Sequence, residues 1–135
     1  MNASQISDRL ADACHSLKWV KPALRSSVPA AYPAAYVLVT SETADRNPLI
    51  GAHSQIVTTR FAVEIMVTNS TSPATGGEAQ ADLETVREEI KAALMGWQPT
   101  PEHAPCEFTS GQMVEFAGNL AIWRDTYTTS TEERR

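Results

Sequence analysis

Two short stretches contain residue types that bind metals or act as nucleophiles. His103 and Cys106 are three positions apart, and Cys14 is next to His15. A closed zinc site needs about four such ligands, usually as two local pairs. Neighbouring side chains on a helix point roughly 100° apart, so Cys14 and His15 do not readily share one ion. We therefore expect no metal site. A disulfide between Cys14 and Cys106 is an alternative to two reduced thiols, which we favour because no export signal is visible at the N-terminus.

Other candidate chemistry is weaker still. There is no Gly-x-Ser-x-Gly motif for a serine nucleophile, and the adjacent carboxylates Glu88 and Glu89 diverge on a helix. Trp123, Asp125 and Tyr127 alternate onto one face of a predicted strand, where the aromatic rings could stack on bases. An acidic chain does not suit that role, so we interpret them as a packed aromatic cluster with Asp125 hydrogen-bonded at its rim. We expect no catalytic residue and no cofactor.

The periodicity of apolar residues predicts the elements that position these side chains. Spacings of three and four predict helices over residues 2–17 and 78–95, the second ending at Gly96. Strands are predicted over residues 35–40, 55–68, 108–116 and 120–128, with a short edge strand near Trp19 and a tight turn at Gly118 and Asn119. Exposed loops are expected at residues 41–52 and 69–77, and a frayed polar tail at 129–135.

The segment 55–68 alternates strictly, which indicates a strand with one buried and one wetter face. Arg60 and Glu64 fall on the more solvent-exposed face of this strand. Glu84 and Arg87 are among the residues predicted on the solvent-exposed face of the second helix. These elements favour an α+β fold in which a single mixed or antiparallel sheet carries both helices on one face.

Composition limits the possible functions. The chain has 135 residues, 42% hydrophobic and 20% charged, and its net charge is −5. These values are typical of one domain with a real core, spanning residues 1–135. The acidic balance argues against nucleic acid as the main partner, and no apolar stretch is long enough to cross a membrane.

Several segments resemble the tail terminator proteins of long-tailed bacteriophages, also called minor tail or tail-completion proteins. The resemblance spans roughly residues 10–128, and its most specific piece is Ala-Leu-Met-Gly-Trp-Gln-Pro at residues 93–99. The other matching segments are residues 33–38, 41–44 with Asn47, 55–63, 83–87 and 123–125.

The resemblance implies a virion structural protein rather than an enzyme. It implies a hexameric ring at the neck-proximal end of the tail, which stops tail tube polymerisation and provides the surface for head docking. Its partners would be other copies of itself, the tail tube protein and head–tail connector proteins. DNA would only pass through the lumen, no membrane would be involved, and assembly would occur in the host cytoplasm.

Contacts between subunits are expected in the long loop and on the polar face of the long strand, and the candidates are Arg46, Arg60 and Glu64. One alternative is a completion ring at the neck or head–tail connector, which shares the size, acidity and fold class. The least favoured alternative is a small-molecule-binding or enzymatic α+β domain, because such a domain would need polar groups converging in an apolar pocket.

Overall fold

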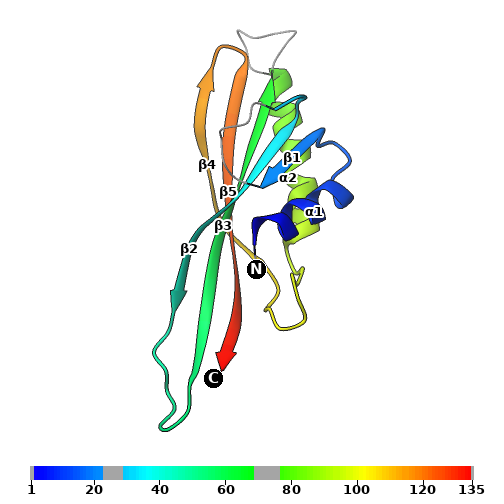
Figure 1. The fold of residues 1–135 in the computed structure, drawn as a ribbon. Coiled ribbons are helices and arrows are strands. Elements are labelled where there is room, and N and C mark those ends of the chain that lie inside the picture. The colour runs from blue at the N-terminus through cyan, green and yellow to red at the C-terminus, as the bar shows by residue number, and fades with distance from the viewer. Residues whose placement is uncertain (1, 23–28, 69–76, 135) are drawn as a thin grey trace.

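A computed structural model describes residues 2–22, 29–68 and 77–134 (Figure 1). The elements follow the order α1 (Ala3–Ala13), β1 (Trp19–Pro22), β2 (Ala34–Ala44), β3 (Ser54–Thr68), α2 (Gly77–Leu94), β4 (Glu107–Ala117) and β5 (Leu120–Arg134). The strands form one sheet in the order β1-β2-β3-β5-β4. The β1–β2 pair is parallel and the other pairs are antiparallel, so the sheet is mixed.

The helices begin and end where their terminal residues satisfy free backbone groups. The side-chain oxygen of Asn2 accepts a hydrogen bond from the Gln5 N–H, and Gln5 accepts one from the Asn2 N–H, which forms a capping box. The first helix ends at Ala13, earlier than predicted. The second helix ends just before Gly96, whose φ of 84° is the left-handed conformation expected of a stop glycine.

Both helices cover the same face of the sheet (Figure 1), as predicted. The apolar stripes of α1 and α2 meet the inward side chains of the middle strands in one core. Its largest members are Ile6, Leu10, Phe61, Val63, Ile65, Val67, Val86, Ile90, Leu94 and Tyr127. The α+β fold with one mixed sheet is therefore confirmed.

The opposite face of the sheet is not the wetter face that alternation in β3 predicted. Ala34, Tyr36 and Met66 form a second buried cluster there, with Trp19 and Tyr32 among the partly buried side chains around it. Because the segment around β1 adds apolar side chains to this face, β3 is buried on both sides from Phe61 to Val67. The alternating pattern of β3 predicts one buried face. It cannot predict that residues from another segment of the chain bury the other face as well.

The two strands that flank β3 are longer than the sequence indicated. β2 continues through Ala44, so residues 41–44 are strand and the loop covers only 45–53. The polar segment from Thr129, expected to be a frayed tail, continues β5 to Arg134 and pairs with β3, from Thr59↔Thr129 to Ser54↔Arg134. Pairing with β3 supplies the backbone hydrogen bonds that a polar tail would otherwise take from water.

The hairpin of β4 and β5 turns at Gly118 and Asn119, where Gly118 has a φ of 59°, as predicted. The expected loop at residues 69–77 lies almost wholly outside the described residues.

Candidate assembly surfaces

The sheet extends well beyond the helices. β2, β3 and the C-terminal part of β5 continue past the region that α1 and α2 cover (Figure 1). The loop of residues 45–53, which we call the finger loop, joins β2 to β3 at the end of this extension. On this extension the β2 side chains from Ser41 to Ala44 are all exposed. Three paired strands make the extension a continuation of the sheet rather than an isolated hairpin.

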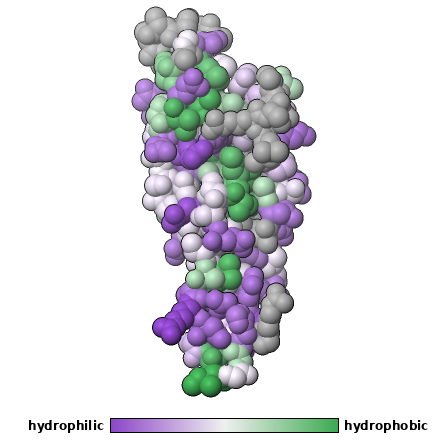
Figure 2. Space-filling model, turned by 60° about the vertical axis from the view of Figure 1, so that its left-hand side comes forward, coloured by the Kyte–Doolittle hydropathy of each residue, from purple (hydrophilic) through white to green (hydrophobic). Residues whose placement is uncertain are grey.

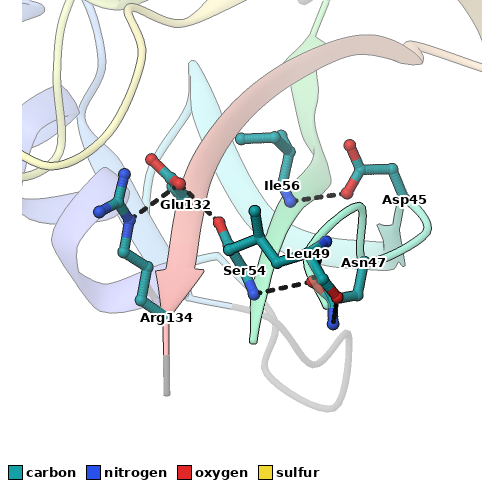
Figure 3. Close-up of polar contacts among 7 residues, drawn as sticks. All are labelled: Asp45, Asn47, Leu49, Ser54, Ile56, Glu132 and Arg134. Carbon is teal, nitrogen blue, oxygen red and sulfur yellow. Dashed lines mark hydrogen bonds and ion pairs between the residues drawn. The ribbon is translucent and has the colours of Figure 1, made fainter. Parts of the chain in front are cut away.

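Polar side chains hold the finger loop in one conformation (Figure 3). Asn47 Oδ1 accepts hydrogen bonds from the backbone N–H groups of Leu49 and Ser54, at 3.2 and 3.0 Å, and its amide donates to the Ala52 carbonyl at 3.0 Å. Asp45 Oδ1 accepts from the Ile56 N–H at 2.7 Å. Asn and Asp commonly bond backbone a few residues away in this manner, which replaces the ladder where strands separate.

The finger loop is also tied to β5. The Ser54 hydroxyl donates to Glu132 Oε1 at 2.6 Å, and Arg134 Nε donates to the same oxygen at 2.9 Å (Figure 3). These contacts lower the pKa of Glu132, first through Ser54 and then through Arg134. The carboxylate therefore stays charged and links the two strands near neutral pH.

Two large apolar side chains lie at the end of this ordered loop. Leu49 is 48% exposed and Ile50 is fully exposed. Figure 2 shows hydrophobic residues at this end of the molecule, below a mostly hydrophilic stretch. Apolar side chains this exposed on an ordered backbone are typical of contact sites for another protein.

Both sides of the sheet offer backbone groups for pairing. β1 covers β2 only from Ala34 to Val37, and no strand among the described residues pairs with the outer edge of β2 beyond that point. β4 forms the opposite edge, where Met113, Val114 and Phe116 are exposed and the register shifts at two places. Bulges hinder strand addition. β2 also has one register shift, between Val39 and Ser41, so its regular open edge runs from Ser41 to Ala44.

Trp123, Asp125 and Tyr127 do lie on one face, but Asp125 is not at a rim. Its side chain is 0% exposed and receives two hydrogen bonds from Arg87, at 2.9 and 3.0 Å, and one from the Trp123 indole N–H at 2.7 Å. The predicted wet-face position of Arg87 is therefore wrong, because this guanidinium turns back over β5. The group is a closed ion pair inside the fold, with every charge compensated.

The three predicted contact residues lie in different environments. Arg46 is exposed in the finger loop, and Arg60 is exposed on the extension opposite Ser41 of β2. Glu64 is only 1% exposed and forms an ion pair with Arg124, which corrects its expected place on a wet face. The structure therefore does not bring Arg60 and Glu64 to one surface.

The remaining titratable candidates are internal. Cys14 and Cys106 are free, buried thiols, and burial raises the pKa of each to about 11. Burial lowers the pKa of His103, whose Nδ1 lies 2.7 Å from the Thr100 hydroxyl. Among the described residues no three or more His, Cys, Asp or Glu side chains gather as metal ligands, and no helix is long and apolar enough to span a membrane.

Sequence reasoning missed three exposed features. Leu49 and Ile50 lie in the loop that the sequence predicts to be exposed, and two adjacent large apolar residues between Pro48 and Gly51 are the signal that could have marked a contact site there. Arg124, the partly exposed member of the ion pair with Glu64, had no such signal, because its partner is 60 residues away.

Open strand edges, a projecting sheet and an apolar loop end are the features of a protein that assembles with other protein chains. A family model described as "Phage tail terminator protein" matches residues 1–135, and the chain therefore belongs to that family. It is a structural component of the virion tail that assembles with other virion proteins.

The fold is also similar to that of a solved chain described as "Virion of native gene transfer agent (GTA) particle". The TM-score is 0.52 at 11% sequence identity, and the match covers 95% of this chain and 84% of that chain. At this identity the likeness concerns the fold alone. No curated protein matches the sequence.

Proposed function

We propose that this protein closes into a hexameric ring on the neck-proximal end of the tail tube. The ring stops tube polymerisation and provides the surface on which the head docks. The family match over residues 1–135 carries this proposal, because it covers the whole α+β unit together with the extension of its sheet.

The two unlike sheet edges support a ring over a two-fold dimer. In a cyclic assembly one surface of each subunit contacts a different surface of the next, and rotation closes the set. The open edge of β2 and the edge of β4 lie on opposite sides of the sheet, which is the arrangement that such a head-to-tail contact needs.

Arg46 and Arg60 are the side chains we propose for contacts between subunits on the extension. Both are exposed, and Arg60 lies beside the open edge of β2. Glu64 contributes to contacts between subunits only indirectly, because Arg124 is the exposed member of their ion pair. The side chain of Arg124 is 31% exposed.

The acidic net charge of −5 supports passage of DNA through the ring without adhesion. Negative groups facing the lumen repel phosphates at short range, within about 8 Å at physiological salt. A bore lined by Arg and Lys would contradict this part of the proposal.

Two measurements test the ring. Light scattering of the purified chain should give about 88 kDa, six times the 14.7 kDa of one chain. Tubes grown with the protein should have defined lengths and a terminal ring in negative-stain images. A charge reversal, Arg60→Glu, should weaken the ring, whereas Glu84→Arg, at an exposed site on α2, should not.

Rings that bind the head connector but never the tube would instead favour a connector-completion protein. A persistent monomer that leaves tube length unlimited would refute the proposed function.

A further inference from the structure

The end of the finger loop presents apolar side chains on a backbone that is already ordered. Leu49 and Ile50 are 48% and fully exposed, while Asn47 bonds the backbone on both sides of them. An ordered loop loses little conformational freedom when it binds, so more of the apolar contact appears as affinity. A large aliphatic side chain on such a loop is suited to act as an anchor.

The position of this anchor indicates from which direction a partner approaches. The edges of β2 and β4 run along the sides of the sheet, whereas Leu49 and Ile50 lie beyond the last strand pairs, at the end of the molecule (Figures 1 and 2). Neighbours in a ring meet side to side. If the strands run along the axis of the proposed ring, a protein that contacts the end of the sheet extension approaches along that axis.

We propose that Leu49 and Ile50 insert into an apolar socket at the end of the tail tube and anchor the ring there. This inference rests on the proposed function. Among axial partners the tube is favoured because permanent contacts are more apolar than transient ones, and ending tube growth requires a contact that persists.

Asn47 is a positioning residue for this anchor. Its side chain touches no partner in this scheme, but it holds the backbone of Leu49, Ala52 and Ser54. Removing its amide leaves the apolar side chains present on a looser loop. Asn47→Ala should therefore weaken tube binding less than loss of Ile50, and should increase hydrogen exchange at the Leu49 and Ser54 amides.

The test is co-sedimentation of the purified protein with tail tubes that lack a terminator, at several protein concentrations. Ile50→Ser and Leu49→Ser should each weaken binding about tenfold or more, as truncation of a central apolar anchor does. The melting temperature of Ile50→Ser should match the wild type, because Ile50 is fully exposed. That of Leu49→Ser should fall slightly, because Leu49 is 48% exposed and the rest of its side chain is covered. Met95→Ser is the matched control, since Met95 is similarly exposed but follows α2, and it should bind tubes normally.

The proposal is overturned if Ile50→Ser binds tubes like the wild type. It is also overturned if light scattering shows that the variant has lost the hexamer, because the anchor would then act between subunits. Normal tube binding with loss of connector binding would assign the anchor to the head side and would likewise refute it. Wild-type protein that binds no tube would refute the proposed function itself, an outcome distinct from any difference between variants.

Discussion

Gly111 on β4 is the position where a single added methyl group should do most damage. A Cβ atom at this residue would lie 2.4 Å from Asp125 Oδ1, 3.0 Å from the Trp123 indole nitrogen and 3.1 Å from Arg87 Nη2. Contacts under 3.0 Å do not persist, so something must move. Asp125 cannot move freely, because it is fully buried and receives three hydrogen bonds from Arg87 and Trp123.

The expected cost of Gly111→Ala follows from that cluster. Overpacking costs about 1–3 kcal/mol, and weakening a hydrogen bond to a buried charge costs about 1.5–3 kcal/mol. Alanine has less conformational entropy than glycine in the unfolded state, which offsets about 0.4–1 kcal/mol of this cost. The sum is a loss of about 3 kcal/mol in the free energy of unfolding. For a chain of 135 residues this lowers the melting temperature by about 10 °C.

Guanidinium unfolding followed by circular dichroism measures this cost. Ser110→Ala is the matched control, because Ser110 is the exposed neighbour on the same strand and should change stability by less than about 0.5 kcal/mol. The NMR signal of the Trp123 indole N–H should also shift in Gly111→Ala and not in the control. A Gly111→Ala protein with the wild-type unfolding midpoint and an unmoved indole signal would show that the reasoning about this cluster is wrong.

Three further outcomes are expected. The buried Tyr127 hydroxyl has no hydrogen-bond partner among the described residues, so Tyr127→Phe should raise the free energy of unfolding by about 1 kcal/mol in denaturant titrations. Cys14 and Cys106 should not react with a thiol reagent at pH 8 until the protein is unfolded, because burial raises the pKa of both to about 11; fast labelling of native protein would contradict this. The Ser16 hydroxyl and N–H donate to Glu89 and lower its pKa, so this contact stabilises the fold above the unfolded pKa and is lost as the pH falls through the folded pKa. Ser16→Ala should raise the pKa of Glu89 in an NMR titration, and its stability deficit at pH 7 should shrink in acid.

Local patterns sufficed for the elements whose signals lie within a few residues. The apolar spacing placed α2 within one residue of its observed bounds, and Gly96 ended it because only glycine readily adopts a φ of 84°. The turn at Gly118 and Asn119 fixes the register of β4 against β5 in the same local way from Ala117 to Glu115, beyond which the register shifts at two places. The fold class followed, since one sheet with two amphipathic helices buries these stripes in few arrangements.

The candidate assembly surfaces were less predictable. Arg46 and Arg60 could be placed on exposed segments from sequence alone, and both are exposed. The finger loop could not be delimited, because its order depends on Asn47 and Asp45 meeting backbone groups across the loop and on Glu132 from the far end of the chain. A segment that looks polar and frayed by composition becomes a strand once β3 is beside it.

Tertiary structure alone decided the fate of the charged side chains. Glu64 and Arg87 occupy positions that periodicity assigned to solvent, yet each is satisfied by a partner on β5 far along the chain. The periodicity of apolar residues indicates on which face of its helix or strand a residue lies. It carries no information about which distant segment of the chain will cover that face. A carboxylate leaves water when the fold supplies a fixed guanidinium in its place, and that exchange depends on long-range pairing.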